Sequence, residues 1–390
     1  MKLSQKACQL FPSEPRRVYD EAQKFTDVID LTLGDPDLPP PRNIREAGSR
    51  AFLEGDSRYS ANAGLIELRR AIAAEARREY GIGFDPETEV IVTAGAMEAA
   101  YLALWSLLDP GSEAIIPSPH WINYGEVVRS FGAAPRFVVT RPEDRFVVRP
   151  EKVEECISPQ TRLLILNTPS NPTGIVIPAG TLDRLAEIAV KHDLAVISDE
   201  IYDHLVYDGR KAESILTRPG MRERTVVISG FSKRFAMTGY RVGWAVGPEE
   251  LIRVMTQMTE NIVECAPLPS QYAAIEALSD RTDGSYIRRE FEKRRNCVLE
   301  ELKTIPQLRC PGIDATFYGF IDVSGTGMDG ETFVSELLRS KRVALIPGAA
   351  YGGTAYRDFV RIAFTVDCGK LHAAFARIRE FLRERVPAVR

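Results

Sequence analysis

Three hydrophobic segments of this chain run directly into polar residues that could do chemistry. Each segment is a short run of aliphatic residues, typical of a buried strand, and the residues that follow include Asn171, Asp199 and Lys233. The segments are 162–166, 194–197 and 225–228. In open α/β sheets, ligands bind beyond the carboxyl ends of the strands. The sequence therefore predicts that an amide, a carboxylate and an amine meet at one edge of one sheet.

Lys233 has apolar neighbours, because it stands between Phe231 and the segment Phe235–Met237. Most lysines are solvated surface charges, and that interpretation applies here too. Burial or a nearby cation such as Arg241 would instead lower the pKa of the amine and free it for Schiff-base chemistry.

Asp199 also has two interpretations. It could cap a helix or form a structural ion pair, or it could be a buried carboxylate that keeps a heterocyclic nitrogen protonated. Tyr202 would lie on the same face of a following helical turn. Trp121 follows another strand, where it could belong to the core or stack on a flat ring.

A possible phosphate site lies where Gly95, Ala96 and Met97 join the strand 90–93 to a helix over 97–108. Small residues let backbone amides approach a phosphate at the positive end of a helix. An ordinary tight turn explains the same residues.

The segment Gly325–Gly330 matches the GxGxxG pattern of dinucleotide-binding proteins. Such a site also needs an acidic residue after the next strand, and the predicted strand 343–346 ends in Pro347 and Gly348. We therefore predict a plain loop here. The hypothesis of a hydride-transfer enzyme would have only these glycines to support it.

Strand and helix patterns alternate through most of the chain, which predicts an α/β fold with a mostly parallel central sheet flanked by helices. After about residue 280 a charged helix over 286–302 introduces a smaller α+β domain. We predict a large domain of residues 42–280 and a small domain of residues 1–41 and 281–390. The prolines 39–41 form a stiff segment where the chain is expected to cross from the small domain to the large one.

The composition excludes several classes of protein. The chain has 390 residues, enough for a large core, and its 50 basic and 54 acidic residues argue against nucleic acid or an anionic membrane as partner. No segment approaches the ~18 apolar residues of a membrane span. The six cysteines and four histidines are scattered without metal-ligand spacing, which predicts no metal site and favours a reducing, cytoplasmic location.

Two longer motifs are highly specific: Ser-Gly-Phe-Ser-Lys-Arg-Phe-Ala-Met-Thr-Gly-Tyr-Arg-Val-Gly over 229–243 and Asn-Thr-Pro-Ser-Asn-Pro-Thr-Gly over 167–174. Together with Leu31–Asp37 and Arg361, they make the chain resemble the class I/II aminotransferases, which are fold-type I pyridoxal-phosphate enzymes. The resemblance covers nearly the whole chain. It implies transfer of an amino group between an L-amino acid and a 2-oxo acid in a ping-pong cycle.

The resemblance implies roles around the cofactor ring. Lys233 would carry pyridoxal 5′-phosphate in a Schiff base and later act as general base and acid. Asp199 would pair with the pyridine nitrogen, Asn171 and Tyr202 would hydrogen-bond the 3-oxygen, and Trp121 would stack on the ring.

The resemblance also implies contacts to the phosphate and the substrate. The phosphate would be bound by the backbone amides of Gly95, Ala96 and Met97, joined by Ser232 and Arg241. Arg361 would clamp the substrate α-carboxylate beside the Gly34 backbone, with Trp121 and Asn171 also at the substrate. Tyr59 would reach the phosphate of a partner subunit, which implies a homodimer.

One departure bears on the substrate. One branch of acidic-substrate aminotransferases that resembles this chain has a lysine at the position of Met97, where it meets the distal carboxylate. Met97 and Tyr124 therefore suggest an apolar or mixed side-chain pocket.

The alternative enzymes are a C–S β-lyase or a decarboxylase, which would keep Lys233, Asp199 and Arg361. A non-enzymatic regulator is expected to carry an added N-terminal DNA-binding domain, and about 30 residues precede Leu31.

Overall fold

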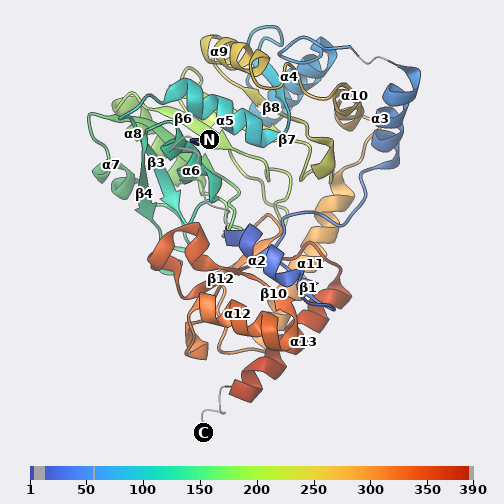
Figure 1. The fold of residues 1–390 in the computed structure, drawn as a ribbon. Coiled ribbons are helices and arrows are strands. Elements are labelled where there is room, and N and C mark those ends of the chain that lie inside the picture. The colour runs from blue at the N-terminus through green and yellow to red at the C-terminus, as the bar shows by residue number, and fades with distance from the viewer. Residues whose placement is uncertain (4–13, 56–57, 386–390) are drawn as a thin grey trace.

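The computed structural model describes residues 1–3, 14–55 and 58–385, and its centre is a seven-stranded sheet (Figure 1). The strand order is β2-β8-β7-β6-β5-β3-β4. Only β8 runs against its neighbours, and the other pairs are parallel. The strands are β2 (Val90–Thr93), β3 (Glu113–Ser118), β4 (Ala134–Val139), β5 (Thr161–Asn167), β6 (Ala195–Asp199), β7 (Thr225–Gly230) and β8 (Gly243–Val246). The predicted α/β fold with a mostly parallel sheet is confirmed.

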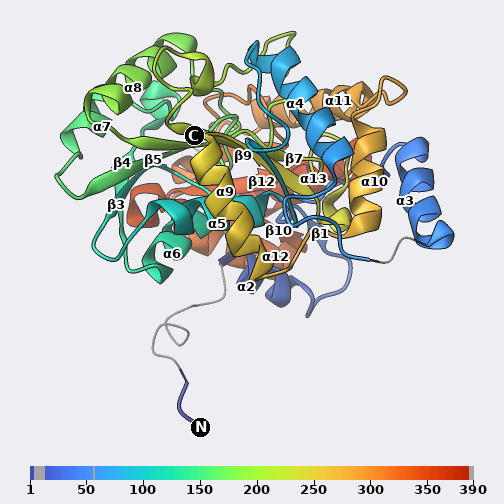
Figure 2. The same cartoon turned by 90° about the horizontal axis from the view of Figure 1, so that it is seen from above.

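Helices cover both faces of this sheet (Figure 2). Successive side chains of a strand point to opposite faces: Leu163 and Ile165 of β5 pack in the cluster that contains α5, whereas Leu164 and Leu166 pack in the cluster that contains α8. The helices of this region are α3 (Arg42–Glu54), α4 (Ile66–Tyr80), α5 (Ala96–Leu107), α6 (Asn123–Ser130), α7 (Pro150–Glu155), α8 (Ala179–Lys191), α9 (Glu249–Glu260) and α10 (Leu268–Ala277). Burial on both faces explains why the central strands are continuously apolar.

Two small sheets lie beyond the carboxyl ends of β5, β6 and β7. In one, β1 (Ile29–Asp30) pairs with β10 (Val343–Ala344); the other has the order β11-β12-β9 and is antiparallel. Its strands are β9 (Tyr318–Asp322), β11 (Ile346–Pro347) and β12 (Phe359–Ala363). The surrounding helices are α2 (Glu14–Ala22), α11 (Ser285–Lys303), α12 (Gly330–Lys341) and α13 (Cys368–Arg385). N-terminal and C-terminal segments thus share one region (Figure 1).

Three local predictions from the sequence can be checked here. The single strand predicted over 343–346 is wrong: β10 pairs with β1, and after Leu345 the chain joins β12 in another sheet. The segment after β6 forms turns rather than a helix. The plain loop predicted at 325–330 is confirmed only in part. The segment follows a strand of an antiparallel sheet, but Ser324–Thr326 form a short 3-10 helix and Gly330 begins α12, which Asp329 caps through the amide of Thr332. No described helix is long and apolar enough to cross a membrane.

Candidate active site

A cavity of about 370 Å³ lies where the carboxyl ends of β5, β6 and β7 face the small sheets. Most residues selected from the sequence line it, although they come from segments as far apart as residues 34 and 361. These are Gly34, Ala96, Met97, Trp121, Asn171, Asp199, Tyr202, Ser232, Lys233, Arg241 and Arg361. Because β5, β6 and β7 are adjacent in the sheet, the predicted meeting of Asn171, Asp199 and Lys233 is confirmed.

Lys233 points its amine into this cavity. Its Nζ donates a hydrogen bond to the backbone oxygen of Gly34 at 2.7 Å. Burial lowers the pKa of Lys233 to about 8 against the attraction of Asp35, and the positive charge of Arg241 acts with burial. A substantial fraction of the amine is therefore neutral and nucleophilic near physiological pH.

Asp199 presents a buried carboxylate to the same cavity. Its Oδ2 accepts a hydrogen bond from the hydroxyl of Tyr124, and its Oδ1 accepts one from the amide of Ile201 at 3.1 Å. Burial nevertheless raises the pKa of Asp199. In the part of the chain that the structure describes, Asp199 forms no direct ion pair, so a cationic ring nitrogen would suit it.

Tyr124 does not belong to the side-chain pocket in which the sequence analysis placed it. It lies on the buried face of α6, only 2% exposed, with its hydroxyl on Asp199. Its ring meets that of Trp121 edge to face, with 5.2 Å between centroids. The α6 helix turns this residue toward the sheet, so Tyr124 supports the carboxylate from behind.

The amino end of α5 faces the cavity through Ala96 and Met97. Ala96 and Met97 begin this helix, and first-turn amides have no partner within a helix. The Gly95 amide, predicted as a third phosphate donor, instead donates to the Thr93 oxygen at 2.8 Å. Gly95 has φ +88°, and a side chain there would collide with the guanidinium of Arg241. The glycine thus brings Arg241 next to the helix end.

Arg361 on β12 is a buried guanidinium without a carboxylate partner among the described residues. It is 5% exposed, its Nη1 donates to Oδ1 of Asn171 at 3.1 Å, and its Nη2 donates to the Thr32 oxygen. Its Nε has no hydrogen-bond partner. Tyr318 and Tyr351 lie against the guanidinium, at 4.4 and 5.1 Å from their ring centroids. A buried charge left in this way is costly unless an anion binds to it, and a carboxylate matches its geometry.

Sequence reasoning missed several residues that line the cavity, above all Tyr318 and Tyr351. The hydroxyl of Tyr202 donates to that of Tyr318 at 3.3 Å, and a Cβ on Gly34 would overlap the Tyr318 hydroxyl. Tyr318 begins an apolar strand that reads as ordinary core, so no signal in the sequence distinguished it.

Tyr59 lies away from this cavity. It precedes α4 and is 82% exposed. Its predicted partner is the cofactor of a second subunit, and a single chain leaves that prediction untested.

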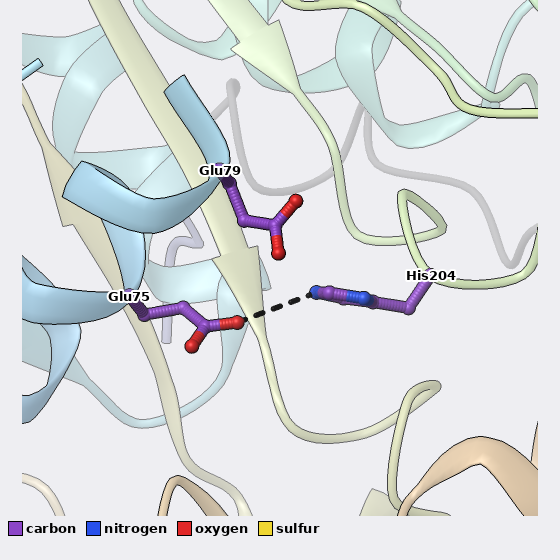
Figure 3. Close-up of side chains that lie close together, drawn as sticks. All are labelled: Glu75, Glu79 and His204. Atoms are coloured by element: carbon purple, nitrogen blue, oxygen red, sulfur yellow. Dashed lines mark ion pairs between the residues drawn. The ribbon is translucent and has the colours of Figure 1, made fainter. Parts of the chain in front are cut away.

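A cluster of acidic residues lies on the far side of the Lys233 segment, where Glu75 and Glu79 of α4 point toward His204 (Figure 3). Glu75 is already paired with two arginines: Nη1 of Arg234 lies 2.5 Å away, and Arg78 binds the other oxygen. Since its charge is compensated, we assign no cation to this cluster. Its effect is to hold Arg234, and with it the backbone beside Lys233.

Comparisons with known proteins identify the family of this chain. Residues 26–378 match the family model "Aminotransferase class I and II". The chain belongs to the class I and II aminotransferases. It is 36% identical to the aromatic-amino-acid aminotransferase 2 of Thermococcus litoralis and 36% identical to an aspartate aminotransferase of Pyrococcus abyssi, and each match covers 99% of both chains.

The solved structures give the same answer for the fold. The aspartate aminotransferase of Thermus thermophilus, determined with maleate, superposes with a TM-score of 0.92 at 35% identity and covers 97% of this chain and 99% of its own. Membership of this family makes the chain a transaminase. The members of the family are pyridoxal-phosphate enzymes. Neither comparison separates an acidic from an aromatic substrate, because relatives of both names match equally well.

Proposed function

We propose that this aminotransferase binds pyridoxal 5′-phosphate in the cavity and exchanges an amino group between an L-amino acid and a 2-oxo acid. The proposal rests on one observation: Lys233 and Arg361 line the same cavity. One is an amine whose pKa burial lowers to about 8. The other is a buried guanidinium with no carboxylate among its described neighbours. A cationic clamp beside a reactive amine suits an α-amino acid.

The residues present fit the cofactor. Asp199 would hold the ring nitrogen, and Trp121 would cover the ring. Tyr202 and Asn171 would contact the 3-oxygen. The free amides of Ala96 and Met97 would bind the phosphate, together with Ser232 and Arg241. This donor set joins a helix amino end to an arginine, which is a general solution for phosphate binding.

When bound, the cofactor withdraws electrons from the substrate Cα. Arg361 orients the α-carboxylate with a bidentate contact, which fixes the direction of the Cα–H bond. Lys233, partly neutral near pH 8, would take the proton from Cα and deliver it to the cofactor carbon that is bonded to the amino nitrogen. Asp199 would keep the ring nitrogen protonated. Tyr318 and Tyr351 exclude water from the Arg361 side of the cavity.

The substrate side chain would meet an apolar or mixed surface. Met97 and Ile122 line the cavity beside Asn123, and the basic residues of the lining are Lys233, Arg241 and Arg361. Each of these three has a role at the cofactor or the α-carboxylate. Among the described residues that line the cavity, no further cation is then left for a distal carboxylate, which favours apolar or aromatic amino donors over aspartate.

We also propose that the enzyme is a cytoplasmic homodimer with a large domain of residues 42–280 and a small domain of residues 1–41 and 281–390. The exposed Tyr59 would complete a partner's phosphate site, and Phe52 and Leu53 leave apolar surface nearby, 78% and 82% exposed. The described cysteines are free, which suits a reducing compartment.

Borohydride reduction of the protein loaded with pyridoxal phosphate, followed by peptide mapping, tests the central assignment. We expect one pyridoxyl group per chain, on Lys233, and none after Lys233→Ala. Loss of the bound pyridoxal spectrum on adding amino donors in one turnover, restored by pyruvate or 2-oxoglutarate, would establish transamination. An adduct on another lysine, or release of pyruvate and ammonia from cystathionine without an acceptor as the main reaction, would overturn the proposal.

A further inference from the structure

Tyr318 contacts both the residue expected at the cofactor 3-oxygen and the residue expected at the substrate carboxylate. It begins β9, it is buried, and it lines the active-site cavity. Its hydroxyl meets that of Tyr202, and its ring lies against the guanidinium of Arg361. The hydroxyl and the ring of one side chain therefore join two parts of the site that are far apart in the sequence.

The pairing of β9 with β12 places the ring of Tyr318 on Arg361. Tyr318 lies directly opposite Ala363 in this antiparallel pair. Arg361 is two residues from Ala363 and is thus a diagonal neighbour on the same face, within reach of an aromatic side chain. The guanidinium carbon lies 4.4 Å from the ring centroid. Cation–π attraction is strongest where water is excluded, so the ring restricts the orientation of a guanidinium whose Nε has no hydrogen-bond partner.

The hydroxyl of Tyr318 accepts a hydrogen bond from the hydroxyl of Tyr202 at 3.3 Å, and the two rings meet edge to face with 5.8 Å between centroids. Both hydroxyls are neutral, because burial raises the pKa of each tyrosine. A neutral hydroxyl can donate one hydrogen bond and accept others. When Tyr202 turns its proton to the cofactor 3-oxygen, Tyr318 can therefore donate its own proton to the Tyr202 oxygen. Hydrogen bonds arranged in such a chain strengthen one another.

The position of the Tyr318 side chain is fixed from two further directions. Its backbone amide donates to Oγ1 of Thr316 at 3.0 Å. Its hydroxyl rests against Gly34, where an added Cβ would overlap it. The carbonyl oxygen of the same glycine accepts the hydrogen bond from Nζ of Lys233. A side chain held in this way can fix the orientation of the groups that it contacts.

We propose that Tyr318 is a positioning residue that links the carboxylate clamp to the cofactor ring. Its ring orients Arg361 for the substrate α-carboxylate, and its hydroxyl orients Tyr202 toward the 3-oxygen. This inference rests on the proposed function, because both roles need the cofactor and an α-amino acid in the cavity. Tyr318 acts through these two neighbours and not on the reacting atoms. The two roles belong to different atoms, so Tyr318→Phe removes one of them and Tyr318→Leu removes both.

Two other interpretations of the same contacts lead to different results. A side chain that only excludes water would affect turnover without changing the titration of the bound cofactor. A hydroxyl that binds the substrate carboxylate directly would make Tyr318→Phe as poor a binder of carboxylates as Tyr318→Leu. The hydroxyl of Tyr318 has Tyr202 as its partner, and the guanidinium of Arg361 meets the ring. These contacts favour action through the two neighbouring residues.

Spectrophotometric pH titration of the full-length protein loaded with pyridoxal phosphate tests the role of the hydroxyl. A hydrogen bond from Tyr202 stabilises the 3-oxygen as an anion, most strongly once the Schiff-base nitrogen on Lys233 has lost its proton. Tyr202→Phe should therefore raise the pKa of the Schiff base, and Tyr318→Phe should raise it by a smaller amount, about 0.3 unit. In the Tyr202→Phe background, Tyr318→Phe should add no shift. Tyr351→Phe is the matched control, because the Tyr351 ring also lies on the clamp but its hydroxyl has no partner, and it should leave this pKa unchanged.

Calorimetric binding of two carboxylates without an amino group, 3-phenylpropionate and succinate, tests the role of the ring. Tyr318→Leu should weaken the binding of both at least about tenfold, whereas Tyr318→Phe should change it less than about twofold.

The outcomes separate this proposal from the proposed function. A wild type without a titrating pyridoxal Schiff base would refute the proposed function itself. A wild type that titrates, together with a Tyr318→Phe variant that titrates identically or shifts equally in the Tyr202→Phe background, would overturn only the role of Tyr318. Equal loss of carboxylate binding in Tyr318→Phe and Tyr318→Leu would also overturn it. The titrations use only tyrosine-to-phenylalanine changes, so they decide the question even if Tyr318→Leu does not fold.

Discussion

The hydroxyl of Tyr124 donates a hydrogen bond to Oδ2 of Asp199, and both side chains are buried. Burial raises the pKa of Asp199, and this hydrogen bond is the largest influence that opposes the rise. Tyr124 is itself neutral, because burial raises its pKa well above the usual value. Tyr124 therefore stabilises the ionised carboxylate of Asp199 without bringing a positive charge that would pair with it in place of a cationic ring nitrogen.

Tyr124→Phe should move the acid limb of the pH profile. A hydrogen bond to a charged group contributes about 1.5–3 kcal/mol, and one pKa unit is 1.36 kcal/mol. Without the donor, the pKa of Asp199 rises further, so ionisation is lost at a higher pH. We expect the acid limb of kcat/KM to shift to higher pH. Tyr80→Phe is the matched control, because Tyr80 donates to Glu200 outside the cavity. Coincident acid limbs in wild type and Tyr124→Phe would contradict this role.

The part of the site that sequence reasoning found lies at the ends of the central strands. Asn171, Asp199 and Lys233 each follow an apolar strand, and strands β5, β6 and β7 lie side by side, so a rule about strand ends places the three residues together. The apolar runs show that these strands are covered on both faces, whereas their order in the sheet comes from the structure.

The rest of the site depends on packing between distant segments. Gly34 and Arg361 reach the cavity only because β1, β10 and β12 fold against the large sheet, and in the sequence they were recognised by family resemblance alone. Tyr318 and Tyr351 look like ordinary core aromatics until their hydroxyls are placed. Tyr124 was assigned to the wrong surface because the direction of a side chain on α6 depends on how that helix docks.

Arg361 should determine recognition of the α-carboxylate. Replacing Arg361 by Gln leaves a substrate carboxylate facing a dry cavity without its charge partner, a loss of about 2–5 kcal/mol. We expect kcat/KM for amino acids to fall at least about thirtyfold, mostly through KM. Arg361→Lys should recover only part of this loss, because an ammonium lacks the bidentate fork. An amine donor without a carboxylate is the control, and an equal loss with that donor would contradict the assignment.

Lys233 should reduce the stability of the cofactor-free protein at neutral pH. Its pKa is about 8 when folded and 10.5 in the reference state, so the unfolded chain binds more protons between these values. Stability then rises as the pH increases from about 8 to 10.5, and below pH 8 the buried charge costs up to about 3 kcal/mol.

Lys233→Met removes this cost, so the cofactor-free variant should melt at a higher temperature than the wild type at pH 7. The difference should shrink as the pH approaches 10.5. The exposed Lys211 provides the control, because Lys211→Met should leave both the melting temperature and its pH dependence nearly unchanged. A Lys233→Met gain that is the same at pH 7 and pH 10 would show that repacking, rather than a buried ammonium, is responsible.

Met97→Lys should shift substrate preference toward dicarboxylic amino acids. Met97 lines the cavity with its Sδ 3.9 Å from Nδ2 of Asn123, so a lysine there would place an ammonium beside the substrate side chain. The charge would attract a distal carboxylate and would cost desolvation against an apolar side chain. We expect the ratio of kcat/KM for aspartate to that for phenylalanine to rise at least tenfold. Met97→Leu keeps the volume without the charge and should leave the ratio nearly unchanged. If the wild type already turns over aspartate faster than every apolar donor, the pocket is not apolar and this prediction is wrong.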